Sequence, residues 1–463
     1  MALPSGCVLV FTLSLFMPAM VSSQQQQPIL NPDEQESVYR VLESVNSDIP
    51  WRSLFPDDLC SSAPHGVVCD FYGGGDDDNS TADTLHITEL SFGYVSDYSM
   101  NPPCTPNSTL SPTIFTFKYL RKLFFYGCFT GTQVSPPPIP PSFGSYLEEL
   151  VLVENPSLAG SLAGVLGNYS RLRRVILTGT GLNGEIPEGI GSLPELEQIT
   201  LARNRLAGEL PRSLGDLKKL RVLDLSHNGF QGNVPDSIGR LSRLLKLDLS
   251  SNRFEGKIPE TMKDLQELEI LDLSYNGFAN FGVPLFLAEM PRLREVHLSG
   301  NPLGGQIPEI WEKLGDILGI GFSGVGLVGN IPASMGVFLR NMSYLGLDNN
   351  RLEGTVPPEL GFLDSINEMN LENNMLSGRL PFSSKFTARI GEKLKLAGNP
   401  ELCVDEGLSS AAAKNGISSG HLKFCSKPHI PDAALFSGSS SIHQASHLLL
   451  LLLGFFSVFS FID

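Results

Sequence analysis

A repeat of 24 residues fills the middle of this 463-residue chain and limits its possible folds more than any other feature. Four stretches show it plainly: LRVLDLSHNGFQGNVP, LLKLDLSSNRFEGKIP, LEILDLSYNGFANFGVP and LGLDNNRLEGTVP. One asparagine recurs in each repeat, in the series Asn204, Asn228, Asn252, Asn276, Asn301, Asn350, Asn374 and Asn399. The gaps are 24 or 25 residues, with one double gap in which Val325 takes the position. A repeat of this length cannot bury its own apolar face, so it stacks on its neighbours as a solenoid.

The pattern L-x-L within each repeat predicts a short strand whose leucines point inward. Stacked strands then form a parallel sheet with turns about 4.8 Å apart. The recurring asparagine turns inward, where its amide can satisfy backbone groups of neighbouring turns. Cys128 and Thr180 occupy earlier positions of the series and can partly replace it, whereas Val325 cannot. We therefore predict an irregular turn at Val325.

A second series of Gly-x-Ile/Leu/Val-Pro follows the asparagines. Gly permits a bend, and Pro then fixes an extended backbone. The glycines are Gly184, Gly208, Gly232, Gly256, Gly305, Gly329, Gly354 and Gly378. The Asn276 turn departs from this pattern, because Asn280 stands in place of Gly and Pro284 comes one residue late. The series accounts for much of the excess of Gly (46) and Pro (33).

A helix is predicted near the start of the chain. Asn31 is suited to the N-cap, Pro32 to the first helical position, and acidic residues follow in the first turn. Apolar residues then recur at helical spacing, at Val38, Val41, Leu42 and Val45.

The repeat L-x-x-L-x-L-x-x-N-x-L-x-G-x-I-P resembles the plant-specific leucine-rich repeat. Trp51, Cys60 and Cys69 resemble the cap that precedes the first repeat in that family. The start EQESVYRVLESVNSDIPW, the pair Cys104 and Cys128, and the end of the chain resemble a smaller group. These are the receptor-like proteins of the Piriformospora indica-insensitive protein 2 type, related to Too Many Mouths. The resemblance implies an α/β fold: a right-handed leucine-rich-repeat superhelix with a parallel concave β-sheet and disulfide-capped ends.

Seven cysteines are present, and Cys7 lies in a segment that we expect to be removed. Six remain, and an even number in a secreted chain indicates disulfides. Of the 15 possible connectivities we favour the sequential pairs Cys60–Cys69, Cys104–Cys128 and Cys403–Cys425. Four sequons predict surface glycans, at Asn79, Asn107, Asn168 and Asn341.

Both ends of the chain have the composition of targeting signals. Residues 1–23 are predicted to be a secretory signal cleaved after Ser23. Near the other end, three small residues from Ser437 are followed by a mostly polar spacer and an apolar tail from Leu448. This order is that of a GPI-attachment signal, with Ser437, or alternatively Gly438, as the lipidated residue. The alternatives are a short transmembrane anchor and a fully secreted form.

These features predict one elongated array between two processed ends. The expected segments are a signal peptide (1–23), an N-terminal helical and cysteine cap (24–84), about 13 repeats (85–400), a C-terminal cysteine cap (401–430), a linker with the lipid-attachment region (431–447) and a removable tail (448–463).

Charge narrows the choice of partners. Lys and Arg number 33 against 49 Asp and Glu, a formal net charge of −16. This argues against a nucleic-acid partner and against a polybasic membrane patch. Any membrane contact is expected through the lipid anchor.

The residues between the two strand leucines form a column on the predicted concave face. In order they are Val151, Ile176, Thr200, Asp224, Asp248, Asp272, His297, Gly321, Gly346, Asn370 and Lys395. The three stacked aspartates repel one another unless they are paired, and Lys246 in the next column can offset part of this. One hypothesis is that these aspartates, with Tyr275 and His297, bind a basic peptide or partner loop. The alternative is that D-L-S is ordinary repeat sequence.

The glycines near Val325 are a second candidate. Gly319, Gly321 and Gly324 leave the strand bare, so that another backbone can approach closely. The alternative is a degenerate repeat without a role. These glycines also match G-x-G-x-x-G, but no helix follows the match, so we expect no nucleotide site.

No catalytic constellation is evident. The chain lacks the kinase motifs V-A-I-K, H-R-D and D-F-G and the G-x-S-x-G elbow. Its eight histidines show no metal spacing, apart from one pair in the predicted tail region. We expect neither an enzyme nor a cofactor or metal site.

The sequence therefore favours a GPI-anchored protein on the extracellular side of the plasma membrane. The resemblance implies a kinase-less co-receptor in plant defence, symbiosis or development, which binds a protein or peptide ligand together with a membrane receptor kinase. The alternatives are a secreted or wall-associated inhibitor of microbial wall-degrading enzymes and a structural wall adhesin.

Overall fold

The computed structural model describes residues 29–72, 84–93, 101–140, 143–166, 169–405 and 422–426. The chain divides into two units, Met1–Cys425 and Ser426–Asp463, and the description below concerns the first. The expected signal peptide, the sequons at Asn79 and Asn168, and the tail with Ser437 lie outside the described residues. Within the described residues, no helix is both long and apolar enough to cross a membrane.

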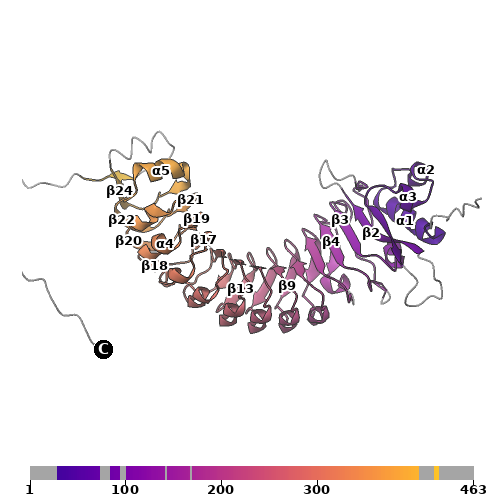
Figure 1. Cartoon of the computed structure of the whole chain (residues 1–463), viewed down its shortest axis with the longest axis horizontal. Coiled ribbons are helices and arrows are strands. Elements are labelled where there is room, and N and C mark those ends of the chain that lie inside the picture. The colour runs from indigo at the N-terminus through magenta and orange to yellow at the C-terminus, as the bar shows by residue number, and fades with distance from the viewer. Residues whose placement is uncertain are drawn as a thin grey trace, which may run out of the picture. The chain divides into compact units, whose positions relative to one another are not determined.

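The N-terminal cap holds three short helices, α1 (Pro32–Val45), α2 (Trp51–Leu54) and α3 (Leu59–Ser62). The predicted start of α1 is confirmed, because the Asn31 side chain accepts a hydrogen bond of 2.8 Å from the Asp33 amide. The predicted apolar face of α1 is buried. Trp51 is buried beside it and donates from Nε1 to the Asn46 carbonyl at 2.7 Å. This helical layer covers the first end of the repeat array (Figure 1).

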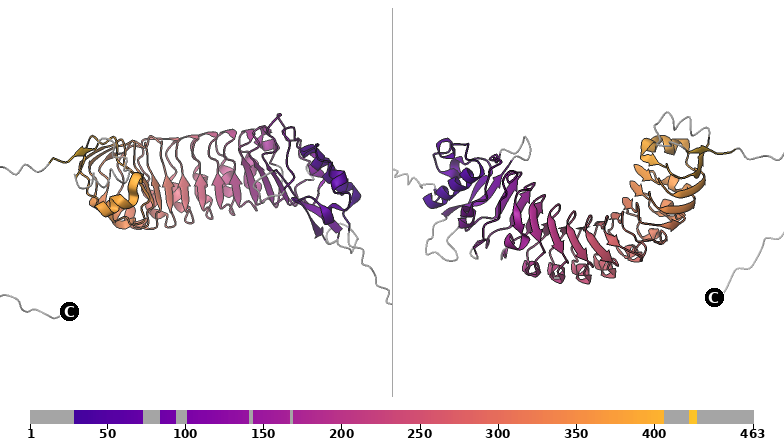
Figure 2. Two further views of the ribbon diagram at one scale, coloured as in Figure 1. Left: turned by 90° about the horizontal axis from the view of Figure 1, so that it is seen from above. Right: turned by 180° about the vertical axis from the view of Figure 1, so that it is seen from behind.

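One sheet of fourteen strands runs through the whole array. Its first strand is antiparallel to the second, and each later pairing is parallel. Within this unit the sheet lies on the inner, concave side of the curve (Figure 1, Figure 2). In spatial order the strands are β1 (Val67–Tyr72), β2 (Thr84–Phe92), β3 (Lys122–Tyr126), β4 (Glu149–Val153), β6 (Arg174–Thr178), β8 (Gln198–Thr200), β10 (Val222–Asp224), β12 (Lys246–Asp248), β14 (Ile270–Asp272), β16 (Glu295–His297), β17 (Gly319–Gly321), β19 (Tyr344–Gly346), β21 (Glu368–Asn370) and β23 (Leu394–Lys395).

Two smaller sheets are formed by the segments that follow the recurring asparagines, and the second is completed by β25 of the C-terminal cap. The first has six strands: β5 (Ala159–Ser161), β7 (Gly181–Gly184), β9 (Arg205–Gly208), β11 (Gly229–Gly232), β13 (Arg253–Gly256) and β15 (Gly277–Phe278). The second has five: β18 (Val328–Gly329), β20 (Arg351–Thr355), β22 (Met375–Arg379), β24 (Glu401–Val404) and β25 (Lys423–Phe424).

The gap between these two sheets falls on the Asn301 turn, one repeat before the Val325 turn at which the irregularity was expected. In regular turns the asparagine Oδ1 accepts from a backbone amide of the preceding turn, as Asn228 does from Leu206. Val325 has no such acceptor, and the Leu303 amide donates instead to the Asn301 carbonyl at 2.9 Å. Pro302 also lacks an amide hydrogen. The Asn301 turn therefore forms no strand, so that one sheet ends at β15 and the next begins at β18, the strand that follows Val325.

Short helices connect the smaller sheets back to the large one. Most are 3-10 turns that follow the prolines of the Gly-x-x-Pro series, and in the middle turns they lie on the outer side of the curve (Figure 1). They are η1 (Pro112–Thr116), η2 (Leu162–Gly164), η3 (Glu188–Ser192), η4 (Arg212–Asp216), η5 (Asp236–Arg240), η6 (Glu260–Asp264), η7 (Leu285–Glu289), η8 (Trp311–Lys313), η9 (Pro358–Phe362) and η10 (Gly391–Lys393), with the α-helices α4 (Ala333–Phe338) and α5 (Ser384–Ile390).

The recurring asparagines bond to the backbone between turns, as expected. Asn374 is 4% exposed, and its Nδ2 donates to the Leu347 carbonyl of the preceding turn at 2.9 Å. Its Oδ1 accepts from the Leu352 amide at 3.0 Å. Thr180 partly replaces such an asparagine, because its Oγ1 accepts from the Leu182 amide at 3.3 Å. Each turn is thus pinned to its neighbour by buried side-chain hydrogen bonds as well as by leucine packing.

Three disulfides join Cys60 to Cys69, Cys104 to Cys128 and Cys403 to Cys425, the connectivity favoured from the sequence. Cys128 occupies an asparagine position, so this position holds a disulfide in place of an amide. Of the two sequons within the described residues, both Asn107 and Asn341 have exposed side chains. Both are accessible positions for the expected glycans.

Candidate functional site

The predicted column of side chains exists as one row across the large sheet. Strand pairing places its members directly opposite one another on successive strands. The structure adds Phe124 at the N-terminal end of the predicted column. The row therefore consists of Phe124, Val151, Ile176, Thr200, Asp224, Asp248, Asp272, His297, Gly321, Gly346, Asn370 and Lys395. We call it the central row. Its middle part is the candidate site.

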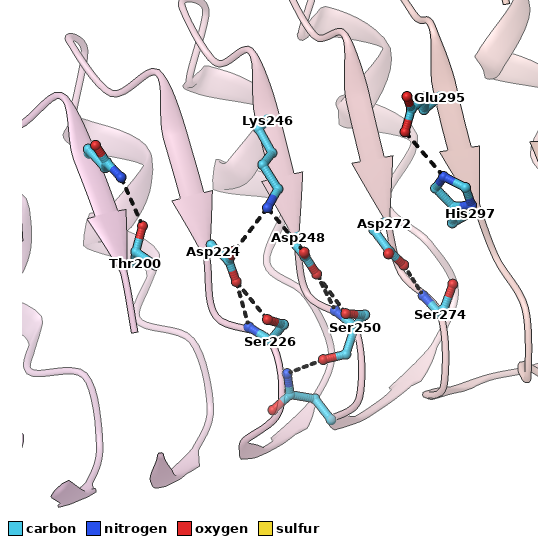
Figure 3. A network of polar contacts seen from close by, with 12 residues as sticks. Thr200, Asp224, Ser226, Lys246, Asp248, Ser250, Asp272, Ser274, Glu295 and His297 are labelled. Atoms are coloured by element: carbon cyan, nitrogen blue, oxygen red, sulfur yellow. Dashed lines mark hydrogen bonds and ion pairs between the residues drawn. The ribbon is translucent and has the colours of Figure 1, made fainter. Parts of the chain in front are cut away.

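Two of the three aspartates are paired within the molecule. Lys246 Nζ lies 2.9 Å from Asp224 Oδ2 and 3.3 Å from Asp248 Oδ2, so one cation bridges both carboxylates. Each carboxylate also accepts from a serine two residues later, Asp224 from the Ser226 hydroxyl and Asp248 from the Ser250 hydroxyl, both at 2.7 Å. Figure 3 shows Lys246 reaching between the two strands. Much of the repulsion expected between these aspartates is therefore compensated.

The protonation of Lys246 reflects this bridge. Partial burial disfavours its charged form, but the hydrogen bond and the charges of Asp224 and Asp248 outweigh it, and the pKa of Lys246 is raised above its usual value. The lysine is therefore a fixed cation at neutral pH, held in the sheet face by two anions.

Asp272 is different. Its Oδ1 accepts from the Ser274 amide at 2.9 Å, and among the described residues it forms no ion pair. On the next strand, Glu295 Oε2 lies 3.5 Å from His297 Nε2 (Figure 3). One lysine therefore faces four carboxylates, those of Asp224, Asp248, Asp272 and Glu295, and the uncompensated negative charge lies at the β14 and β16 end.

The glycines beyond His297 are covered by side chains of this chain. A Cβ added at Gly321 would lie 2.6 Å from His297 Nδ1, and one added at Gly346 would lie 2.5 Å from the Tyr344 hydroxyl. The imidazole and phenol rings occupy the space that a side chain would fill, and their centroids are 6.3 Å apart. The strand is therefore not bare at Gly321, contrary to the idea that a partner backbone approaches there. Glycine is needed because His297 and Tyr344 lie over the sheet.

Tyr344 lies in an acidic environment. Its partial burial, followed by the charges of Asp348 and Glu368, raises the pKa of its hydroxyl. The phenol is neutral at physiological pH and can donate a hydrogen bond to an acceptor on the inner face.

Tyr275 lies beside the row rather than within it. It follows β14 by three residues, is 65% exposed, and has a left-handed backbone with φ 56°. Its ring covers Gly300, whose added Cβ would meet Tyr275 Cδ1 at 2.6 Å. Alignment of the repeats correctly placed Asp272 and His297 opposite each other on adjacent strands. The sequence hypothesis also included Tyr275 in the site, and the structure places this residue beside the row.

Sequence reasoning did not include Glu295 and Tyr344 in the site. Each stands two residues before a member of the central row, His297 and Gly346, and so projects from the same face of its strand. This two-residue spacing is the signal that could have found them. Together with Asp272 and His297 they form a half-exposed surface of carboxylates and rings. Such a surface suits reversible binding of a cation.

Within the described residues, no set of three or more His, Cys, Asp or Glu side chains gathers closely enough to hold a metal ion.

Comparisons with known proteins agree with this fold. The family model of a leucine-rich repeat region matches residues 146–387. The chain is 36% identical over 143 residues to the Arabidopsis thaliana Protein TOO MANY MOUTHS, a stretch covering 31% of this chain and 26% of that protein. It is 34% identical over 166 residues to Piriformospora indica-insensitive protein 2 of Arabidopsis thaliana, covering 35% and 36% respectively. The matched stretches thus span between a quarter and about a third of these curated relatives.

Among solved structures, the chain is similar to the ectodomain of the Arabidopsis receptor kinase HAESA in complex with an N-terminally extended IDA peptide hormone ligand. That match has a TM-score of 0.55 and 30% identity and covers 64% of this chain and 48% of that one. The crystal structure of PEPR1-AtPEP1 matches with a TM-score of 0.58 and 25% identity, covering 81% of this chain and 52% of that one.

Proposed function

The chain belongs to the leucine-rich repeat family, and from this premise we propose that it is an extracellular cell-surface binding protein of plants. In this proposal it acts as a co-receptor in defence, symbiosis or development. It binds a peptide or protein ligand and works together with a membrane receptor kinase. The resemblance to plant receptor-like proteins and to a receptor ectodomain with a peptide hormone supports this reading.

One observation carries the proposal. The inner sheet presents a continuous row of side chains in register, and its middle keeps negative charge that Lys246 does not neutralise. Asp272 and Glu295 project from neighbouring strands, beside the imidazole of His297. Because opposite charges attract most strongly where water is partly excluded, this half-buried group suits a lysine or arginine side chain of a ligand.

The proposal includes membrane attachment through a lipid at Ser437. Its support is the order of small residues, polar spacer and apolar tail in the sequence. The sequence also contains none of the kinase motifs, which is why we assign intracellular signalling to a partner.

The test is affinity purification of the tagged, glycosylated protein from plant membranes, with partners identified by mass spectrometry. We expect saturable recovery of a receptor kinase, and reduced recovery with the double variant Asp272→Asn/Glu295→Gln. Both substitutions keep the side-chain size and remove only charge. Asp236→Asn is the matched control, since Asp236 is an exposed carboxylate on η5, on the outer helices rather than on the inner sheet.

Equal recovery of the kinase by the wild type and the double variant contradicts the assignment of the site. Recovery of a microbial wall-degrading enzyme in place of a kinase supports the inhibitor alternative. The absence of any saturable partner supports the adhesin alternative. Both of these outcomes overturn the co-receptor proposal.

A further inference from the structure

The N-terminal part of the central row is apolar. Phe124, Val151 and Ile176 occupy successive strands, and strand pairing sets each opposite the next. Phe124 and Ile176 are half-exposed, and Val151 between them is 6% exposed. Tyr126 and Val153, two residues further along β3 and β4, project from the same face and widen this surface. We call these five residues the apolar sector.

The apolar side chains on the inner face are not needed for the core, because the leucines on the other face of the same strands already form it. Leu123 and Leu150 are 4% exposed, as inward-facing residues should be. Phe124 and Ile176 point the opposite way, where a solvated sheet normally carries polar residues. These partly exposed side chains offer apolar surface that a ligand side chain can bury further.

The apolar sector and the acidic group lie on one line. From Ile176 the row continues through Thr200, Asp224 and Asp248 to Asp272, four strand steps in register. At about 4.8 Å per step, Ile176 and Asp272 are about 19 Å apart along the sheet. An extended chain rises about 3.3 Å per residue, so about six residues cover this span.

Lys246 determines where the basic residue of a ligand would lie. It compensates Asp224 and Asp248, the two aspartates nearer to the apolar sector. Among the described residues, Asp272 and Glu295 have no lysine or arginine partner, and Glu295 lies beside the His297 imidazole. A second cation is therefore disfavoured beside Lys246 and favoured one or two strands further on. The stretch between holds Thr200 and the serine-bonded carboxylates, which can accept hydrogen bonds from a peptide backbone.

We propose that the central row binds one extended peptide in which an apolar residue and a Lys or Arg are separated by about six residues. The apolar residue contacts Phe124 and Ile176, and the cation contacts Asp272 and Glu295. This inference rests on the proposed function and specifies the ligand. Charge complementarity at one end and burial of apolar surface at the other select this occupant over a uniformly polar loop.

The experiment is a selection from a random library of linear peptides on the full-length glycosylated protein, purified from plant membranes in detergent. Peptides of about twelve residues are long enough to cross the row. We expect the retained peptides to share an apolar residue and a Lys or Arg about six positions apart, in either chain direction. Their affinity should fall when salt is raised, because the acidic group is half-exposed.

Two variants test the two ends separately on individual retained peptides. Phe124→Ser/Ile176→Ser should weaken binding about tenfold or more, as expected for losing the burial of a large apolar side chain. Asp272→Asn/Glu295→Gln should weaken binding by a similar factor and reduce its salt dependence. Met375→Ser is the matched control, because Met375 is 60% exposed on β22, outside the inner sheet. Thermal unfolding confirms that each variant remains folded.

The outcomes separate this inference from the proposed function. If the acidic variant weakens binding and Phe124→Ser/Ile176→Ser does not, the apolar contact is overturned and the basic-ligand site stands. If retained peptides carry no recurrent apolar–basic spacing, the extended-peptide assignment is overturned. If folded proteins bind and linear peptides do not, the extended-peptide assignment is overturned in favour of a folded protein partner. If neither variant changes affinity, both the inference and the proposed site fail.

Discussion

Replacing Lys246 by methionine removes the cation that bridges two carboxylates and keeps a chain of similar length and apolar stem. The wild-type lysine approaches Asp224 at 2.9 Å and Asp248 at 3.3 Å. In the variant these two carboxylates remain on adjacent strands, about 4.8 Å apart along the sheet, with only serine donors. The repulsion between the Asp224 and Asp248 carboxylates should then destabilise the folded variant. The same two carboxylates should also be more available to an external cation.

The size of the stability loss depends on how far the paired side chains are exposed to water. A hydrogen bond to a charged group contributes about 1.5–3 kcal/mol, and breaking a fully buried pair costs about 3–5 kcal/mol. Here the lysine side chain is 33% exposed and the carboxylates are 14% exposed, so water replaces part of what is lost. We expect Lys246→Met to lower the free energy of unfolding by about 2 kcal/mol at pH 7.

Urea unfolding followed by circular dichroism measures this loss. It should hold below pH 10.5 and shrink as pH rises above that value, because the pKa of Lys246 is raised from it in the folded chain and the lysine then loses its charge. Lys246→Arg should be close to wild type, and Lys313→Met is the control, because Lys313 is exposed and has no ion pair within the described residues. A variant as stable as wild type at pH 7, or a loss independent of pH, would refute the bridging role of Lys246. The same variant should bind basic peptides more tightly than wild type.

Three further predictions concern the repeats, the tyrosine and the anchor. Asn374→Ala should lower the free energy of unfolding by about 2–4 kcal/mol, because buried backbone groups lose their partners, and a urea-measured loss below about 0.5 kcal/mol contradicts this. The raised pKa of Tyr344 means that the unfolded chain ionises first, so its contribution to stability is present below pH 10.0 and is lost as pH rises above it. Ultraviolet titration of wild type against Tyr344→Phe shows whether the phenolate appears above that pH, as expected, or below it. Phosphatidylinositol-specific phospholipase should release the protein from plant membranes if Ser437 carries the lipid, and full retention in the membrane argues for another anchor.

The stacking of the repeats could be predicted from the sequence, because each structural role in a turn requires one residue type at one spacing. Asparagine carries both a donor and an acceptor on a short side chain, so its period of 24 residues predicted the inter-turn hydrogen bonds. The same reasoning identified Val325 as the residue that cannot make them, and the smaller sheet is interrupted in the turn before it. The register of the central row followed directly from aligning the repeats.

Other features depend on how long side chains lie on the sheet, which spacing alone does not determine. The sequence predicted bare backbone at Gly321, but the His297 side chain covers it, and Tyr344 covers Gly346 in the same way. Lys246 was expected to offset the aspartates only in part, and the structure shows that it compensates Asp224 and Asp248 and leaves Asp272 without a cation. The distribution of charge within the row, and hence the place of a ligand cation, required the geometry.

The most direct measurement is calorimetric titration of the full-length protein with one retained basic peptide, comparing wild type with Asp272→Asn/Glu295→Gln. If the inner sheet binds a cation at this point, the variant should bind about tenfold or more weakly, with a smaller dependence on salt. The control Asp236→Asn should match wild type. Equal affinity and equal salt dependence in wild type and double variant would contradict the assignment of the central row as the ligand surface.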